Sequence, residues 1–423
     1  MAALAEQPSE NNPTERPPTA RLFALIFLPF ALGYFFSYLY RTVNAVIGPD
    51  LALEMSLSPG QLGLLTSAYF IAFASAQIPV GIYLDSHGPR RVVTGLLLVA
   101  AIGAFLFSIG EGLWSLLIGR ALIGLGVAAC LMGAFKAMSE WFPGDKLPLM
   151  NGLVVAFGGL GAMVATAPTE ALVSAVGWRY GFVALALATF AVAVTIWFVA
   201  PERTRAGSSE PMAARIRGMF SVYRSGVFWR IAPLAALSQG GFLAIQTLWA
   251  GPWLRDIAGL DSRTVSFTLL AGAGGFVIGN LVIGFVAGRL ARRNIPPLVT
   301  AAVGMGLFIL VQFLVLLEWT SAPGLLWFVF GATGTAGVVV FSVLARVFPP
   351  ELAGRASTAQ NLLIFAAAFA LQWGMGEVIN IWPVAADGAY SVMGYRAAFG
   401  IALALQVAAF AWMLVYRPRA VAR

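Results

Sequence analysis

The sequence predicts an all-α integral membrane protein in which twelve transmembrane helices form two pseudo-symmetric six-helix bundles. Composition is the first observation behind this prediction. Of the 423 residues, 60% are hydrophobic and 10% are charged, whereas about a quarter are charged in an ordinary soluble domain. A spanning helix needs about 20 mostly apolar residues. Twelve such helices leave only short connections, so we expect no large soluble domain between them.

Apolar runs separated by short polar stretches are the second observation. Residues 201–229 form the longest polar stretch and divide the expected helices into six plus six. A basic segment within this stretch predicts a helix on the membrane surface. The expected helices are 22–48, 59–83, 91–110, 113–139, 149–174, 179–200, 230–254, 264–288, 296–317, 323–345, 356–381 and 392–416.

A repeat between the two halves is the third observation. Phe-Pro-Gly-Asp at 142–145 follows the fourth helix, and Phe-Pro-Pro-Glu at 348–351 follows the tenth. GWRYGF at 177–182 opens the sixth helix, and GYRAAF at 394–399 opens the twelfth. Duplicated halves are typical of transporters that bind substrate between two bundles and expose it to each side in turn.

The distribution of charge predicts the orientation in the membrane. Nineteen lysines and arginines lie on the side of the termini, and four lie on the other side: Arg179, Arg255, Arg263 and Arg396. Because positive charge accumulates in cytoplasmic loops, we expect both termini in the cytoplasm and the protein in a plasma membrane, such as a bacterial inner membrane. The net charge of +8 then reflects helix flanks and no nucleic-acid partner.

These observations predict five segments along the chain. The first is polar and contains four prolines, which is typical of disorder. In order, the expected segments are a disordered cytoplasmic tail at 1–20, a bundle at 21–200, a cytoplasmic central loop at 201–229, a bundle at 230–416 and a cytoplasmic tail at 417–423.

The residue inventory argues against an enzyme. His87 is the one histidine and Cys130 the one cysteine, so a multi-histidine metal site and an internal disulfide are excluded. The sequence has no phosphate-binding glycine loop and no nucleophile elbow. We therefore expect no catalytic residues, no metal and no cofactor.

Two motifs in the first half resemble signatures of the major facilitator superfamily. Gly81-x-x-x-Asp85-x-x-Gly88-x-Arg90-Arg91 is similar to the family's signature between helices 2 and 3. Residues 117–129, with Arg120 followed by Gly124 and Gly126, are similar to its helix 4 signature. The resemblance covers about residues 22–416 and implies that Arg120 takes part in coupling or gating.

The first signature has a physical interpretation as a conformational latch. Gly81 would let two helices approach closely, and Asp85 would pair with an arginine or a helix amino terminus. Arg90 and Arg91 would bind headgroups. The second half has Gly288 in the place of Asp85, so we expect the latch in the first half alone. A tight basic loop without a latch function is the alternative.

Helix 1 contains Tyr38-Leu-Tyr40-Arg41, which resembles a stretch of anion:cation symporters and organophosphate antiporters. In those carriers the arginine contacts the negative group of the substrate. Tyr40 stands where the anion symporters usually have aspartate. Gln246 stands on helix 7 where the organophosphate carriers add a second arginine. The resemblance therefore favours a carboxylate over a phosphate ester.

The residues around Arg41 predict a polar helix face. An arginine near the centre of a span costs about 2.5 to 3.5 kcal/mol on insertion scales, so it usually faces a cavity or a partner. Tyr34, Ser37, Tyr38, Arg41 and Asn44 share one face, as expected of a cavity wall. Alternatively, helix 1 ends near Arg41 and the side chain reaches the headgroups.

Helix 7 occupies the equivalent place in the second half. Gln239, Phe242, Gln246, Trp249 and Trp253 recur on one face. The amides could orient a substrate and the aromatics could cover its apolar part. The alternative is that the aromatics belong to helix packing or an interfacial belt.

Other candidate residues have weaker signals. Gln77 on helix 2 and Asn280 on helix 8 are possible polar neighbours of the substrate site. Lys136 lies near the cytoplasmic end of helix 4, which favours extension to the headgroups. Glu170 and Glu377 occupy near-equivalent places in the two halves and would serve proton coupling or outer gating, or be solvated helix ends.

The sequence thus predicts a monomeric secondary transporter in the lipid bilayer, such as a symporter. It would move a small polar, anionic, carboxylate-type solute, with a coupling proton, by alternating access. One alternative is a proton-coupled exporter of amphipathic compounds. A third interpretation is a sensor or assembly partner that has the transporter fold and does not transport.

Overall fold

The structure is a computed structural model that describes residues 19–202, 212–385 and 388–416. The expected tail at 417–423 lies outside the described residues, and so does the expected tail at 1–20 apart from residues 19 and 20. Part of the expected central loop, 203–211, also lies outside them. The described residues form helices and no strand.

The first half contains ten helical elements. They are α1 (Thr19–Leu22), the π-helical η1 (Phe23–Phe27), α2 (Leu28–Thr42), α3 (Asn44–Glu54), α4 (Pro59–Ser108), α5 (Leu113–Gly126), α6 (Cys130–Trp141), the 3₁₀ turn η2 (Gly144–Lys146), α7 (Leu147–Val164) and α8 (Ala167–Val199).

The second half is preceded by α9 (Met212–Tyr223), a helix where the sequence predicts one. The elements that follow are α10 (Gly226–Ala244), the π-helical η3 (Ile245–Trp249), α11 (Ala250–Asp256), α12 (Ser262–Ala291), α13 (Pro297–Leu316), α14 (Pro323–Gly334), the 3₁₀ turn η4 (Thr335–Val338), α15 (Val339–Val347), α16 (Pro350–Ile379) and α17 (Val392–Val415).

Eleven helical runs in the described residues are long and apolar enough to cross a membrane, and one of them, α4, is long enough to cross it twice. At about 1.5 Å per residue, its 50 residues are far longer than a bilayer core of about 30 Å. Gly88, with φ 77°, turns the chain in a conformation that favours glycine. Gly81 lies half-buried before this turn. The twelve predicted spans are confirmed.

Helix 1 is longer than the predicted range 22–48, because α3 continues it to Glu54. Pro49 and Asp50 indicate a helix end in the sequence, yet Pro49 lies inside α3. A proline in a spanning helix removes one backbone hydrogen bond, and neighbouring helices can compensate for it. Leu51 is fully buried beyond it, so packing continues past the proline.

The repeat has the same backbone geometry in both halves. Phe142 has φ −94° and ψ 148°, and Phe348 has φ −91° and ψ 150°. Each precedes a proline, which favours this extended conformation. Pro143 and Pro349 follow with ψ of 151° in both cases. The repeated Phe-Pro pair therefore ends the fourth and the tenth helix in one way.

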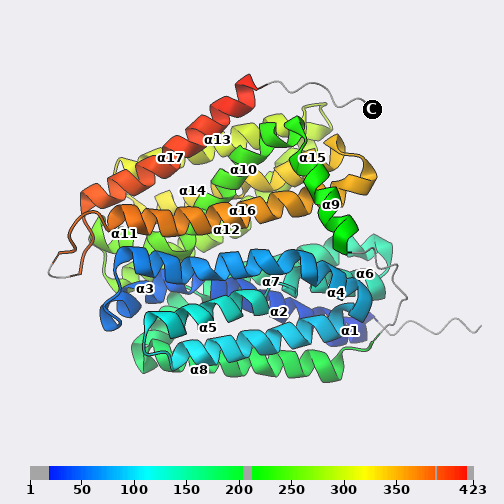
Figure 1. Cartoon of the computed structure of the whole chain (residues 1–423), viewed down its shortest axis with the longest axis horizontal. Helices are drawn as coiled ribbons and strands as arrows, with labels where there is room; N and C mark the ends of the chain where they lie inside the picture. Colours follow the sequence, from blue (N-terminus) through cyan, green and yellow to red (C-terminus); the bar gives the residue numbers. More distant parts are fainter. Residues whose placement is uncertain (1–18, 203–211, 386–387, 417–423) are drawn as a thin grey trace, which may run out of the picture.

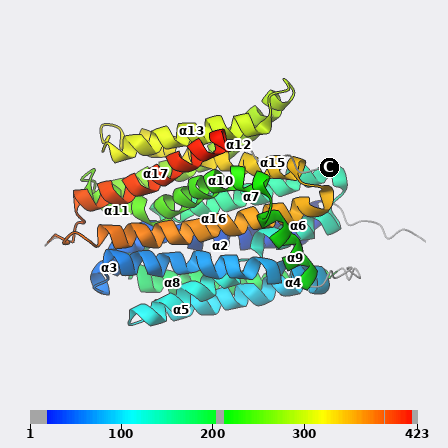
Figure 2. The ribbon, with the colours of Figure 1, turned by 45° about the horizontal axis from the view of Figure 1, so that its top comes forward.

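The two groups of helices lie side by side. In both views α16 of the second half lies along α4 of the first (Figure 1, Figure 2). We call the left end in Figure 1, with α3 and α11, the α3 end, and the right end, with α6 and α9, the α6 end. The limits 21–200 and 230–416 remain our proposed boundaries for the bundles.

Glycines bring the two halves together at the α3 end. A Cβ atom on Gly376 of α16 would lie 2.5 Å from the carbonyl oxygen of Pro59. Gly251 of α11 similarly leaves no space for a Cβ beside the carbonyl oxygen of Ala45. In a regular helix the Ala45 carbonyl oxygen would accept a hydrogen bond from the backbone N–H of residue 49, but Pro49 has no N–H to donate. We call this contact the glycine seam; its members are Gly60, Gly63, Gly251 and Gly376.

Candidate functional site

Arg41 lies inside the molecule, in the middle of the first span. Arg41 is 6% exposed, and the helix continues beyond it through α3. Its Nε atom is buried without a hydrogen-bond partner. Among the described residues, no carboxylate lies within ion-pair distance of it. A buried arginine without a counter-charge is unusual, because such charges are normally paired.

Four aromatic rings surround this guanidinium, and we call them the aromatic cage. The ring centroids lie 4.5 Å from Arg41 Cζ for Tyr38, 5.3 Å for Phe73 and Phe365, and 5.8 Å for Tyr69. Attraction between a cation and ring faces stabilises the charge at such distances. Phe365 belongs to α16, so the cage joins the two halves.

The sequence did not indicate three of the cage residues. Tyr69 and Phe73 are one turn apart on α4 and their rings stack at 5.9 Å. The Tyr69 hydroxyl donates to the Ser37 carbonyl oxygen at 3.1 Å, which fixes its ring beside helix 1. The i, i+4 spacing of Tyr69 and Phe73 was a usable signal. Phe365 gave none, since its place depends on how the halves pack.

The predicted polar face of helix 1 carries several buried atoms without partners. Ser37 Oγ, Arg41 Nε and Asn44 Oδ1 are all buried and lack a hydrogen-bond partner. Asn44 uses its Nδ2 to donate to Thr66 Oγ1 at 2.9 Å. Tyr34 is buried and packs edge-on against Tyr38 at 5.2 Å. Because buried polar atoms are normally hydrogen-bonded, this face has spare capacity for water or a solute.

Arg120 is also buried but is anchored to the protein. Its residue is 0% exposed, and Nη1 donates to the Tyr40 carbonyl oxygen at 3.0 Å. Its guanidinium lies 5.5 Å from the Tyr69 ring, so Arg41 and Arg120 share this ring. Gly124 allows the approach, because a Cβ there would clash with the backbone of Tyr69. Arg120 therefore connects α5, in the fourth span, to α2, in the first span.

Three residues of the first signature, Asp85, Arg90 and Arg91, make ion pairs in the structure. Asp85 pairs with Lys136 at 2.8 Å, because α6 lies beside α4 at this level. Extension of Lys136 to the headgroups was thus the wrong interpretation. Arg90 and Arg91 both pair with Glu202, at 3.8 and 2.5 Å. The Gly88 turn places these arginines beside the end of α8, and their binding to headgroups stays a prediction.

The four predicted amides other than Asn44 differ in their surroundings. Gln77 Nε2 points to the Ala128 carbonyl oxygen at 3.5 Å, in the interruption between α5 and α6. Asn280 Nδ2 donates to a carbonyl oxygen of its own helix at 2.8 Å. Gln239 Nε2 is buried without a partner. Gln246 is half-buried within η3. Gln239 and Gln246 thus keep donors for a ligand, whereas the other two use theirs.

The aromatic face of helix 7 is part of the packed interior. Phe242 stacks on Phe330 at 5.7 Å. Trp249 is 0% exposed, and its Nε1 donates to the Gln372 carbonyl oxygen at 3.0 Å. Trp253 packs against Trp327 at 5.7 Å. The packing interpretation describes these three residues better than direct contact with a substrate does.

The two candidate carboxylates do not meet. Glu170 is half-buried and accepts a hydrogen bond from Ser174 Oγ at 2.8 Å. Glu377 is exposed and accepts from Trp373 Nε1 at 2.8 Å. A Cβ on Gly60 would lie 2.5 Å from Glu377 Oε1, so Glu377 borders the glycine seam. In the described part of the chain, no three His, Cys, Asp or Glu residues form a metal-binding group.

Comparison with known proteins gives a family and several relatives. A family model described as Major Facilitator Superfamily matches residues 30–372. The chain is 24% identical over 277 residues to the probable sulfoacetate transporter SauU of Cupriavidus necator, covering 62% of this chain and 64% of the relative. It is 27% identical over 237 residues to the nitrite extrusion protein of Bacillus subtilis, covering 54% and 58%. These matches span less than two thirds of either relative.

Two further likenesses extend over nearly the whole chain. The transcription regulatory protein OpdE of Pseudomonas aeruginosa is 26% identical over 410 residues, which covers 94% of this chain and 92% of the relative. A solved bacterial homologue of the human lysosomal transporter Spinster, inward-facing and occupied, superposes with a TM-score of 0.75 at 17% identity, covering 92% of this chain and 95% of that one. This second likeness is one of fold.

Proposed function

Because the chain belongs to the major facilitator superfamily, we propose that it is a secondary active transporter that moves a small anion of the carboxylate type. The chain is a multi-pass integral membrane protein and not an enzyme. The observation that carries the proposal is Arg41, a buried guanidinium in the aromatic cage without a carboxylate partner among the described residues.

The chemistry of this site favours an anion. The aromatic rings attract the cation but do not neutralise it, so an incoming anion would supply the missing counter-charge. A planar guanidinium binds carboxylate-like groups through two parallel hydrogen bonds. Ser37 Oγ and Asn44 Oδ1, both unpartnered, would bind a second polar group of the solute or a water. We therefore place the anionic group at Arg41.

The names of two relatives support an anionic solute. Sulfoacetate and nitrite, named in those relatives, are both small anions. Neither is a phosphate ester. We propose carboxylates and sulfonates as the first classes to test.

The arrangement of the halves supports alternating access as the mechanism. Phe365 contributes to the cage from α16, so movement of the second half would change the surroundings of Arg41. The glycine seam closes the α3 end. We propose that the α6 end and both termini are cytoplasmic, since basic residues gather there, and that the protein functions as a monomer. Glu377 beside the seam is our candidate for proton coupling.

Transport in proteoliposomes would test the role of Arg41. We expect Arg41→Gln to abolish uptake of the anion that the wild-type protein carries. The same anion, at about 100 times its Kd, should stabilise the wild-type protein by roughly 2.7 kcal/mol and leave the variant unchanged. Arg120→Gln is the matched control, because Arg120 is equally buried but bound to Tyr40; ligand stabilisation should persist there. Unchanged anion uptake by Arg41→Gln would refute the assignment.

A second candidate is a sensor that binds the anion without transporting it. The near full-length match to a protein named as a transcription regulatory protein favours it. Ligand stabilisation that depends on Arg41, without uptake of any anion in either direction, would support the sensor over the transporter. The exporter of amphipathic compounds loses its main support, because the helix 7 aromatics are packed in the interior.

A further inference from the structure

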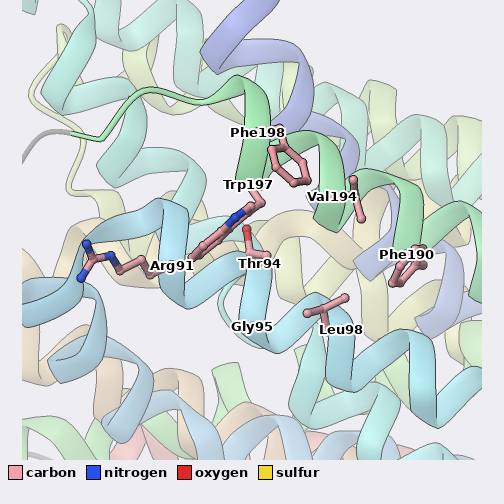
Figure 3. Close-up of a pocket in the computed structure, with 8 residues that line it drawn as sticks. All are labelled: Arg91, Thr94, Gly95, Leu98, Phe190, Val194, Trp197 and Phe198. Carbon is pink, nitrogen blue, oxygen red and sulfur yellow. The ribbon is translucent and has the colours of Figure 1, made fainter.

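A groove between α4 and α8 lies away from the site at Arg41. It has a volume of about 320 Å³ and is lined by one face of each helix. Leu98 and Gly95 contribute from α4, and Phe190, Trp197 and Phe198 contribute from α8. Figure 3 shows these aromatic side chains along the groove and Arg91 at one end of it.

The body of the groove faces outward and is apolar. Phe190 is 52% exposed and Phe198 is 78% exposed, although both belong to a span. Such residues of a membrane protein face lipid tails rather than water. A Cβ on Gly95 would meet no atom within 4 Å, so this glycine leaves the floor of the groove open. The groove therefore has the shape and polarity to hold an acyl chain.

One end of the groove is basic. The Arg91 side chain is 55% exposed and binds Glu202 through Nε. Arg90 binds the same carboxylate, and its guanidinium lies 5.2 Å from the Trp197 ring. Two arginines thus share one glutamate, so these three side chains together carry one excess positive charge. In Figure 3 the Arg91 guanidinium points away from the aromatic residues. A lipid with its acyl chain along these aromatic residues would therefore have its headgroup near Arg91.

We propose that this groove binds one anionic phospholipid, with its phosphate at Arg91 and an acyl chain over Gly95. Basic pockets between spanning helices on the cytoplasmic side are suited to anionic headgroups. Trp197 lies within one turn of the end of α8, and tryptophan is enriched at membrane interfaces. Arg91 at one end and the apolar residues along the groove together favour a lipid. A small soluble anion would contact Arg91 but would leave the apolar part of the groove unfilled.

The second half contains a groove that serves as an internal control. It has a volume of about 280 Å³ and lies between α10, α16 and α17. Leu237, Gly374 and Leu405 are among its lining residues, none of which is charged. A Cβ on Gly374 also meets no atom within 4 Å. Filling this groove should not affect a preference for anionic lipid.

Native mass spectrometry of the purified full-length chain in micelles would count the retained lipids. We compare dioleoylphosphatidylglycerol, which is anionic, with dioleoylphosphatidylcholine. Gly95→Leu should retain one phosphatidylglycerol fewer than the wild-type protein. Arg91→Gln should lose the preference for phosphatidylglycerol, and Gly374→Leu should behave as the wild type does. Equal retention of phosphatidylglycerol by Gly95→Leu and the wild type would overturn the proposal.

Thermal unfolding gives a second readout that does not depend on transport. A bound lipid at about 100 times its Kd raises the ratio of folded to unfolded protein about 100-fold. Phosphatidylglycerol should therefore raise the Tm of the wild-type protein and of Gly374→Leu, and raise it less in Gly95→Leu. If glycerol phosphate alone raised the Tm as much, the ligand would be a soluble anion and the lipid site would be refuted.

Discussion

The two halves of the molecule fasten their helices at the α3 end with the same kinds of groups in different arrangements. In the first half Trp178 Nε1 and Arg179 Nε both donate to Glu54, at 2.5 and 3.0 Å. Arg179 also donates to the carbonyl oxygens of Ser108 and Gly110, both at 2.9 Å. One arginine thus joins the ends of three spans.

In the second half, two arginines make the contacts that Arg179 alone makes in the first half: Arg255 with Asp256 and Arg396 with Glu318. The Tyr395 hydroxyl donates to Asp256 at 2.8 Å, as Trp178 does to Glu54. Asp256 pairs with Arg255 at 2.6 Å, while Arg396 makes two hydrogen bonds to Glu318, at 2.7 and 3.1 Å. The repeat GWRYGF and GYRAAF therefore preserves an aromatic donor to the end of the first helix of each half. The partner of the arginine differs between the halves.

The interior of the halves differs in charge. The first half buries two arginines, Arg41 and Arg120. The second half instead buries amides, including Gln312 and Gln406, which bond to each other at 2.8 Å in both directions. Buried arginines in the first half and buried amides in the second suit the proposed site, in which the first half would hold the anion.

The largest difference between the halves should appear when the carboxylates of the α3 end are neutralised. The Asp256 side chain is 0% exposed, whereas that of Glu54 is 44% exposed. Breaking a buried pair costs about 3 kcal/mol or more, and breaking an exposed one costs about 1 kcal/mol or less. Asp256→Asn should therefore lower the Tm of the purified protein much more than Glu54→Gln. Equal decreases in Tm would contradict this ranking.

A smaller effect should follow from changes to the amide pair of the second half. Gln312→Leu alone leaves the Gln406 amide without its partner, at a cost of about 2 kcal/mol. Replacing both by leucine removes both orphaned groups, so the double variant should be more stable than either single one. Thermal unfolding of the four proteins measures this coupling. If the loss of stability in the double variant equalled the sum of the two single losses, the two amides would not stabilise each other.

The smallest effect on stability should come from the pair of Asp85 and Lys136, because the second half has Gly288 in the place of Asp85. Asp85 and Lys136 side chains are 40% and 26% exposed, so Asp85→Asn should cost less than about 1 kcal/mol. Gly288→Asp is the matched change in the second half. A Cβ on Gly288 would meet no atom within 4 Å, so this change should shift stability by about 0.5 kcal/mol or less. Uptake by proteoliposomes should fall for Asp85→Asn alone. Unchanged uptake would leave Asp85 a structural residue.

The fold could be predicted from sequence because its signals are local or repeated. Apolar runs set the spans, and the Phe142-Pro143 and Phe348-Pro349 pairs marked equivalent helix ends. The end of helix 1 was missed, since Pro49 breaks a helix in water more readily than in a packed span. The contact between Gly251 and Ala45 depends on the other half and has no local signal.

The site could be predicted in part. The spacing of Tyr34, Tyr38, Arg41 and Asn44 indicated one face, because helical periodicity is a property of the segment alone. The pairing of Asp85 with Lys136 and the position of Phe365 were not predictable in this way. Both depend on which helices become neighbours, and a single sequence contains no measure of that.

In the proposed alternating access, the glycine seam would influence how fast the two halves separate and rejoin. Where main chains touch directly, as at Gly251 with Ala45 and Gly376 with Pro59, no rotamers have to rearrange at the contact. Opening there exposes little flexible side chain, and reclosing requires no search among alternative packings. The rate at this end should then be set by rigid movement of whole helices through the bilayer, with lipid viscosity as the main resistance.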